Sequence, residues 1–287
     1  MKKNLDIIKK CISERYAIPQ FNINNLEWAK YILEACEEEK SPVYLGVSVG
    51  ASKYMGGYNT VVGMIKGLIK DLKITVPVII HLDHAPSFEE CEKAYNAGFD
   101  SLMIDVSKES LDKNIEITNK VATLGEVIVE AELGHVGGVE DDISSSLEYT
   151  DPKEAEYFCK NTMIDLFAPS LGTLHGLYKS EPHINFDLTK EISNKTKVGL
   201  VLHGGSGLSD DIYKKCIERG VVKINFNTEF QVLWSKEVRE FLENDENVYD
   251  PRKIIGAGEY AIKETAKHYI NVLGSKNKGV IHEENCN

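Results

Sequence analysis

Three histidines stand where apolar, strand-like runs of the chain end. They are His84, His175 and His203, and each follows a run rich in aliphatic residues. Imidazole nitrogens are common ligands of divalent transition metals, and a catalytic zinc site takes three protein ligands and leaves one position open for substrate. Three histidines at the ends of three separate strands therefore indicate a catalytic metal site.

Polar side chains recur at the ends of the predicted strands. Asp83, beside His84, can serve as an acid or a base, and His81 is suited to orient a ligand from behind it. A single polar residue at a strand end is commonly a helix cap, but a repeated series predicts one functional face. The others in the series are Asn22, Ser48, Asp105, Glu132 and Asn225.

Eight predicted strands must position these residues. They span 18–22, 42–48, 77–84, 100–105, 126–132, 163–168, 198–203 and 221–225. Helical spacing of apolar residues falls between and around them, at 4–14, 26–38, 60–72, 87–98, 111–124, 151–160, 187–194, 209–219, 228–242 and 256–273. Repeated βα units imply a parallel sheet with right-handed crossovers. Eight units favour a single (β/α)8 barrel domain over residues 1–287, with a helix before and after it; an open doubly wound sheet is the alternative.

Closing the sheet into a barrel would bring all the carboxyl ends of the strands to one face, where barrel enzymes keep their active sites. Two glycine- or asparagine-rich turns follow the last two strands, at 204–207 and 225–228, and each precedes a helix. Backbone amides at helix N-termini bind phosphate, and these two loops are where barrels often hold it. The sequence therefore predicts a phosphorylated ligand.

Composition narrows the classes of partner. The 287 residues carry a net charge of −12, which argues against nucleic acid or an anionic membrane as partner. No apolar run reaches the ~18 residues of a membrane span, and the N-terminus lacks the apolar segment of a secretory signal. The six cysteines are scattered without a C-x-x-C pair, which is typical of reduced thiols. We expect a cytoplasmic protein.

Long stretches of the chain resemble the class II, metal-dependent ketose-bisphosphate aldolases, most of all the short bacterial fructose-bisphosphate aldolases. The stretches are QFNINNLEWAKYILEACEEEKSPVYLGVS, VPVIIHLDH, EAELGHVGGVEDD, LGTLHGLYKSEP, LVLHGGSG, KINFNTE and YDPRKIIGAGEYAIKET. The resemblance implies a (β/α)8 barrel in a homodimer or homotetramer. It also implies one catalytic Zn²⁺ per subunit, a possible Na⁺ or K⁺, and reversible cleavage of fructose 1,6-bisphosphate to dihydroxyacetone phosphate and glyceraldehyde 3-phosphate.

The resemblance also assigns site residues. His84, His175 and His203 match the family's metal ligands, and Glu132 matches a carboxylate that can swing towards the metal. The positions that match substrate contacts are Asn22, Ser48, Gly176, Gly204, Gly205, Ser206, Asn225, Asn227, Thr228 and Arg252. Gly176, Gly204 and Ser206 among them match backbone contacts to the monovalent cation, and Arg252 matches an arginine that the neighbouring subunit offers to the second phosphate.

Two carboxylates match the family's proton-transfer groups. Retro-aldol cleavage leaves negative charge on the ketone fragment, which a Lewis-acid metal stabilises. Asp83 would take the proton of the C4 hydroxyl, and Glu140 would move the proton at the dihydroxyacetone-phosphate carbon. Residues 133–148, which carry Glu140, have no periodicity and are predicted to form a long loop that closes over the substrate.

Some positions depart from the family pattern and leave the exact sugar open: Val49, Leu177, Asn227 and the stretch 256–259. Tagatose bisphosphate or a related phosphorylated keto-sugar is therefore an alternative substrate. Lys223, on the last predicted strand, would serve a Schiff-base aldolase, but that chemistry gives the three histidines no purpose. A non-catalytic phosphosugar-binding or adhesion protein is the remaining alternative, and Asp83 and Glu140 argue against it.

Overall fold

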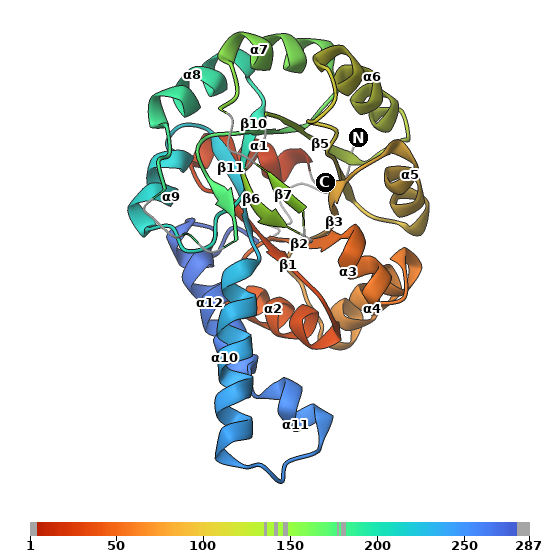
Figure 1. Ribbon diagram of the computed structural model, residues 1–287, viewed down its shortest axis with the longest axis vertical. Coiled ribbons are helices and arrows are strands. Elements are labelled where there is room, and N and C mark those ends of the chain that lie inside the picture. The colour runs from red at the N-terminus through yellow and green to blue at the C-terminus, as the bar shows by residue number, and fades with distance from the viewer. Residues whose placement is uncertain are drawn as a thin grey trace, which may run out of the picture.

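A computed structural model describes residues 5–134, 137–140, 143–145, 149–176, 178 and 182–279, with the backbone alone for 137–140 and 143–145. Eight parallel strands close into a barrel in the order β1-β11-β10-β8-β5-β4-β3-β2 (Figure 1). The predicted barrel is confirmed, and β1 pairs with both β11 and β2, which excludes the open sheet. The strands are β1 (Ile18–Asn22), β2 (Val43–Ser48), β3 (Val78–Ala85), β4 (Ser101–Ile104), β5 (Ile128–Leu133), β8 (Leu166–Pro169), β10 (Gly199–Leu202) and β11 (Val221–Phe226).

Helices surround this barrel (Figure 1). In the described part of the chain they are α1 (Leu5–Glu14), α2 (Leu26–Glu38), α3 (Val49–Tyr54), α4 (Tyr58–Asp71), α5 (Phe88–Ala97), α6 (Leu111–Ala122), α7 (Pro152–Asn161), α8 (Phe186–Thr196), α9 (Asp210–Ile217), α10 (Thr228–Asn244), α11 (Pro251–Gly256) and α12 (Glu259–Val272). The short helices α3 and α11 were not predicted, because six residues are too few to display a helical period. The single helix predicted over 256–273 is α12 alone, since α11 ends at Gly256.

Local signals in the sequence set the boundaries of the crossover helices. Ser87 caps α5 by accepting a hydrogen bond from the amide of Glu90, and Gly98 ends that helix in the left-handed conformation at φ 99°. Asp151 caps α7 by accepting from the amides of Lys153 and Glu154. Ser87 and Asp151 thus mark where their helices begin, and Gly98 marks where α5 ends, close to the predicted boundaries.

The interior of the barrel is apolar at one end and polar towards the other. At the amino-terminal end, Ile8 and Cys11 of α1 pack against residues from the starts of strands, including Ile18, Ile128 and Leu166. Further along the strands, the buried side chains are polar or charged. These are His81, Asp83, Glu130, Glu132 and Lys223. The sealed apolar end leaves the carboxyl ends of the strands as the face where polar chemistry can occur.

A small second sheet lies over this face. It has three strands in the order β7-β6-β9, where β6 is Gly137–Glu140, β7 is Ile143–Ser145 and β9 is Leu174–His175. β6 pairs antiparallel with β7 and parallel with β9, so Gly138 lies opposite His175. The prediction of a loop without regular structure over 133–148 is therefore wrong for β6 and β7. The run is too short and too rich in glycine and serine to show the alternation of a strand.

An arm extends from one side of the barrel. α10 points away from the strands, and α11 lies at the far end of the arm (Figure 1). α12 returns along the arm and packs against α2 and α10. No helix among the described residues is long and apolar enough to cross a membrane.

Candidate active site

The end of β3 carries two adjacent functional side chains. Asp83 is 1% exposed, and His84 has φ 49°, a left-handed backbone that is uncommon for a residue other than glycine. The pairing of β3 with β4 shifts register between Leu82 and Ala85, which marks an irregularity at this point. Neighbours on a regular strand face opposite sides of the sheet. The turn at His84 therefore allows both side chains to face the carboxyl end of the barrel.

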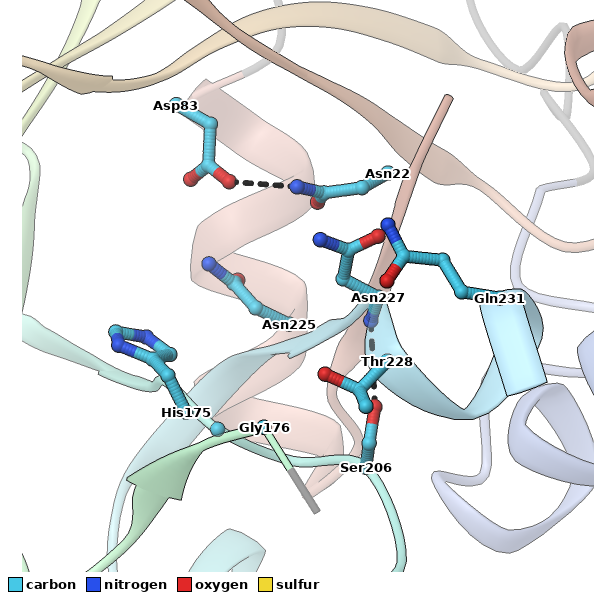
Figure 2. A pocket seen from close by; sticks show the side chains of 10 residues that line it. Asn22, Asp83, His175, Gly176, Ser206, Asn225, Asn227, Thr228 and Gln231 are labelled. Atoms are coloured by element: carbon cyan, nitrogen blue, oxygen red, sulfur yellow. Dashed lines mark hydrogen bonds between the residues drawn. The ribbon is translucent and has the colours of Figure 1, made fainter. Parts of the chain in front are cut away.

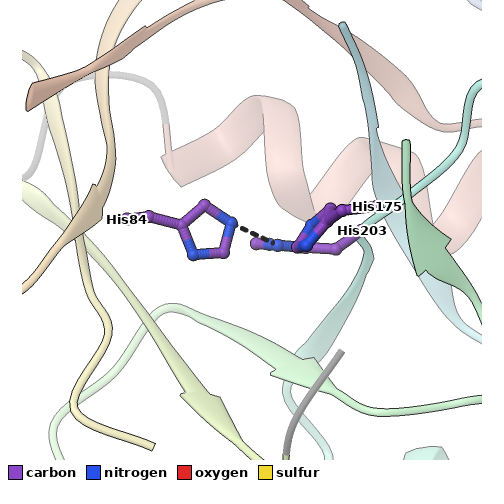
Figure 3. A group of neighbouring side chains, drawn as sticks. All are labelled: His84, His175 and His203. Atoms are coloured by element: carbon purple, nitrogen blue, oxygen red, sulfur yellow. Dashed lines mark hydrogen bonds between the residues drawn. The ribbon is translucent and has the colours of Figure 1, made fainter. Parts of the chain in front are cut away.

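The three predicted histidines lie together. His84 on β3, His175 on β9 and His203 just after β10 offer nitrogen atoms that all lie within 4.8 Å of one another. Figure 3 shows the His84 ring on one side and the His175 and His203 rings on the other, and the ring centroids are 4.7–5.8 Å apart. Residues separated by up to 119 positions in the chain thus form one compact group of imidazoles.

Carboxylates behind two of these rings fix which nitrogen carries a proton. Nδ1 of His84 lies 2.9 Å from Oδ2 of Asp105, and Nε2 of His203 lies 3.0 Å from Oε1 of Glu130. An ionised carboxylate only accepts hydrogen bonds, so in each pair the histidine nitrogen donates. Carboxylate–histidine pairs of this kind orient the ligands of many metal sites.

The opposite nitrogens of the same two rings then point at each other as lone pairs. Nε2 of His84 and Nδ1 of His203 are 2.9 Å apart (Figure 3). Burial lowers the pKa of His203 below its ordinary value, so the ring is neutral at pH 7. Two neutral nitrogens with facing lone pairs repel each other unless a cation shares them. The donor set therefore fits a divalent metal bound by these two nitrogens and by the neighbouring His175.

A fourth possible ligand lies close by. Oε2 of Glu132 is 3.7 Å from Nδ1 of His203 and 4.0 Å from Nδ1 of His84. His84, Asp105 and Glu132 also form a second group whose ligand atoms lie within 4.8 Å of one another. Glu132 is thus near enough to reach a metal at the histidines after a small side-chain movement.

Asp83 lies beside this group and is held by an amide. Its Oδ2 accepts a 2.9 Å hydrogen bond from Nδ2 of Asn22 (Figure 2). Oδ1 of Asn22 in turn accepts from Nε2 of Gln20. Burial by itself would raise the pKa of Asp83, but the nearby His84 and His81 hold it below the usual range. The carboxylate is therefore ionised at neutral pH and can accept a proton from a bound molecule.

A pocket of about 570 Å³, including its open mouth, joins these groups to the loops after β10 and β11 (Figure 2). Its lining includes nine predicted residues: Asn22, Asp83, His175, Gly176, Gly204, Ser206, Asn225, Asn227 and Thr228. It also includes Gln231, which the sequence did not single out. Gln231 stands one helical turn after Asn227 on α10, and its i, i+4 spacing from a residue at the strand end was the available signal.

The first turn of α10 forms one wall of the pocket, so the positive end of the helix dipole faces into the pocket. Oγ of Ser206 accepts from the amides of Asn227 and Glu229 and fixes the loop against the helix. Gly205 lies behind the pocket wall, where its amide donates to the carbonyl of Asn225. The pocket thus has His175 of the histidine group at one end and a helix N-terminus at the other.

Sequence comparisons place the chain among known enzymes. The family model for "Fructose-bisphosphate aldolase class-II" matches residues 2–278. The chain belongs to the class II fructose-bisphosphate aldolase family. Fructose-bisphosphate aldolase of Geobacillus stearothermophilus is 51% identical over 277 residues, covering 95% of this chain and 96% of that protein. The Staphylococcus epidermidis enzyme of the same name is 51% identical over 267 residues, covering 92% of this chain and 93% of that protein.

Solved structures agree with this family. The YdjI aldolase of Escherichia coli K12 superposes with a TM-score of 0.83 at 32% identity, covering 96% of this chain and 98% of that one. The family is metal-dependent and acts on phosphorylated sugars, which matches the histidine group and the pocket described above.

Besides His84, His203, Glu132 and Gly205, three further predicted residues of the family site are not among the described residues that line the pocket. Ser48 caps α3 by accepting from the amide of Ala51. Arg252 lies on α11, where its side chain is 88% exposed and bound to Asp250. Glu140 ends β6, whose backbone is paired beside His175, but its side chain lies outside the described residues. Leu177, one of the departures from the family pattern, also lies outside them.

Lys223 does not reach the pocket. Its side chain is 1% exposed, and its ammonium group lies 2.8 Å from Oε2 of Glu130 and donates to Oδ1 of Asn225 at 2.9 Å. A Schiff-base aldolase needs a lysine amine that meets the substrate carbonyl. Lys223 is absent from the pocket lining and held by these two partners, so the structure argues against that alternative.

Proposed function

We propose that the protein is a zinc-dependent fructose-bisphosphate aldolase that cleaves fructose 1,6-bisphosphate reversibly to dihydroxyacetone phosphate and glyceraldehyde 3-phosphate. The observation that carries the proposal is the convergence of His84, His175 and His203 at the edge of the pocket that His175 and the ionised Asp83 line. The names and the ~50% identity of the relatives support the choice of sugar.

In this proposal His84, His175 and His203 hold the metal, and Glu132 is a carboxylate that can move towards it. Three neutral imidazoles leave a divalent ion its full charge, and the bound ion supplies Lewis-acid stabilisation of the negative charge on the ketone fragment. Because Asp105 and Glu130 anchor two of the rings, the ligand nitrogens need little reorganisation to bind.

Proton transfer falls to two carboxylates. Asp83 accepts the proton of the C4 hydroxyl as the C3–C4 bond breaks. The hydrogen bond that Asp83 accepts from Asn22 directs the carboxylate towards that hydroxyl. Glu140 then exchanges the proton at the dihydroxyacetone-phosphate carbon. Its strand β6 pairs with β9, where Gly138 lies opposite His175, and this supports a place for Glu140 near the pocket.

The remaining pocket residues bind the phosphates and hydroxyls. The ketone-side phosphate sits at the first turn of α10, among Gly176, Gly204, Ser206, Asn225 and Thr228, with a monovalent cation at the backbone of this loop. The opposite phosphate is met by Arg252 of a neighbouring subunit in a homodimer or homotetramer. The exposure of Arg252 on the projecting arm supports this arrangement, because the arm holds it away from the pocket of its own chain.

Metal analysis combined with a cleavage assay tests this function. We expect about one Zn²⁺ per chain, turnover of fructose 1,6-bisphosphate above that of tagatose 1,6-bisphosphate, loss of activity on dialysis against a chelator, and recovery with Zn²⁺. Borohydride added with substrate should not inactivate the enzyme. Full activity in the metal-free protein, or inactivation by borohydride trapping, would contradict the proposal.

A further inference from the structure

A lysine lies buried inside the barrel, beneath the candidate metal site. The Lys223 side chain on β11 is 1% exposed, and lysine is almost never fully buried unless it is paired. Its ammonium group contacts Oε2 of Glu130 at 2.8 Å and Oδ1 of Asn225 at 2.9 Å. These two partners lead to different parts of the site.

The first partner leads to the histidines. Glu130 is fully buried, and its other oxygen, Oε1, lies 3.0 Å from Nε2 of His203. One carboxylate therefore serves two partners: Oε1 accepts the hydrogen bond of His203, and Oε2 forms the ion pair with the ammonium group of Lys223. Because the lysine holds Oε2, the carboxylate is fixed with Oε1 towards the ring, and this keeps the ring nitrogen Nδ1 free of hydrogen and facing His84.

The second partner leads to the substrate pocket. An ammonium group has donors and no acceptor, so Asn225 must turn its oxygen, and not its amino group, towards Lys223. The amino group of Asn225 is then left to face the pocket, between Asp83 and His175 (Figure 2). Without the lysine, the amide could rotate and present its oxygen to the ligand.

We propose that Lys223 is a positioning residue that couples the two halves of the site: through Glu130 it sets the orientation of His203, and through Asn225 it presents an amide donor to the substrate. The inference rests on the proposed function, since it takes His203 as a metal ligand and Asn225 as a substrate contact. It gives Lys223 a role in a metal aldolase that is distinct from Schiff-base chemistry.

Counting donors and acceptors gives a test for the contact between Lys223 and Glu130. Glu130→Gln leaves one acceptor oxygen for two donors, so Lys223 competes with His203, and we expect Co²⁺ affinity to fall about tenfold to a hundredfold. Adding Lys223→Met removes the competitor, so the double variant K223M/E130Q should recover most of that affinity. The measurement is titration of the metal-free proteins with Co²⁺, followed by visible absorption.

The hydrogen bond between Lys223 and Asn225 predicts a separate effect. In Lys223→Met and in K223M/E130Q the amide of Asn225 is no longer fixed, so the KM for fructose 1,6-bisphosphate should rise about fivefold, the equivalent of one hydrogen bond. In Glu130→Gln the lysine still holds Asn225, so KM measured at saturating metal should stay near the wild-type value. The double variant therefore separates restored metal binding from weakened substrate binding.

An ion pair outside the barrel supplies the matched control. Lys263 on α12 lies 2.9 Å from Oε2 of Glu34 on α2, so K263M/E34Q makes the same two changes away from the pocket. We expect it to leave Co²⁺ affinity and KM unchanged. If Lys223→Met alone does not fold, K223M/E130Q still tests both contacts, because it carries no charge at either buried position. If Glu130→Gln alone does not fold, the Co²⁺ affinity of the double variant is compared with that of the wild type, and a loss of more than about tenfold contradicts the role of the Glu130 contact.

Two results would overturn the inference. One is weaker Co²⁺ binding by K223M/E130Q than by Glu130→Gln, which is what a purely structural ion pair predicts. The other is an unchanged KM in the double variant. A wild-type protein that neither binds Co²⁺ nor cleaves the sugar would instead defeat the proposed function, so the two failures are distinguishable.

Discussion

At the scale of single residues, the site depends on which atoms of a side chain already make hydrogen bonds. Oδ2 of Asp83 accepts a hydrogen bond from the side-chain amide of Asn22, and this hydrogen bond holds the carboxylate in one orientation. Its Oδ1 lies 3.8 Å from Nε2 of His81, so one oxygen of the carboxylate is held by an amide and the other lies beside an imidazole.

The first prediction at this scale concerns Asp83. Asp83→Asn keeps the size of the side chain but removes the base, so we expect kcat to fall by about 10²–10⁴-fold with metal content retained. Because the pKa of Asp83 is held below its usual range, the wild-type rate should not fall through protonation of this group between pH 7 and pH 5.

Asp100→Asn is the matched control for this change. The carboxylate of Asp100 accepts from the amide of Ile80 near the start of the strands, away from the pocket, so its loss should affect stability and leave kcat intact. Equal losses of kcat in the two variants would show that Asp83 has no specific role in proton transfer.

At the scale of elements, the glycine-rich loop after β10 is held by contacts that only glycine permits. Gly204 has φ 63°, and a Cβ there would lie 2.4 Å from the carbonyl oxygen of Leu174 on β9. Its own carbonyl accepts a hydrogen bond from the hydroxyl of Tyr178, and the carbonyl of Gly205 accepts from Tyr213. Close backbone packing thus fixes the loop against the strand that carries His175.

Two glycines of this loop give a matched pair of variants. Gly204→Ala combines an unfavourable φ with a backbone clash, so we expect a loss of about 3 kcal/mol in the free energy of unfolding and a higher KM for the bisphosphate. Gly207 has φ 78° but open space around it, so Gly207→Ala should cost only about 1 kcal/mol. Denaturant unfolding measures both, and equal costs would show that the contact with Leu174 can relax.

The sequence predicted the elements of the barrel well and the additions to it poorly. Eight apolar runs with polar ends located the barrel strands, although β8 begins at Leu166 and not at 163. The hairpin β6–β7 and the helices α3 and α11 were missed, because each is shorter than the window in which a period appears.

At the site, sequence patterns found the histidines and Asp83, and the family resemblance supplied most of the other residues. The partners behind the ligands were harder to recognise. Glu130 and Lys223 are charged residues within otherwise apolar strands, and their pairing depends on the closure of the barrel across β5, β8, β10 and β11. No local feature of the sequence states which strands become neighbours, so the link from Lys223 to His203 required the fold.

At the scale of the whole molecule, the projecting arm is the feature that a single chain does not explain. Tyr249 is 90% exposed and Tyr260 is 74% exposed, on the segments that flank α11, and Arg252 on α11 is almost as exposed. Large aromatic side chains and arginine are enriched where proteins contact one another. The arm thus supports an oligomer in which Arg252 enters the pocket of a second copy.

Subunit complementation tests this arrangement. Asp83→Ala and Arg252→Ala should each be nearly inactive alone, the second through a raised KM. If Arg252 acts across the interface, a mixed dimer contains one site with both residues intact. We expect mixing under conditions of subunit exchange to restore activity to a fraction of the wild-type level, measured as initial rate. No recovery in a mixture shown to contain hybrid dimers would mean that Arg252 acts within its own chain.

The left-handed backbone at His84 constrains any attempt to change which ion the protein prefers. Asparagine, aspartate and histidine tolerate this conformation far better than β-branched or bulky side chains do. Among residues that bind metals, aspartate is therefore the replacement that position 84 accepts most readily. An engineer would be steered towards an oxygen ligand there, and hence towards harder cations such as Mn²⁺ or Mg²⁺, before any contact with the ion is considered.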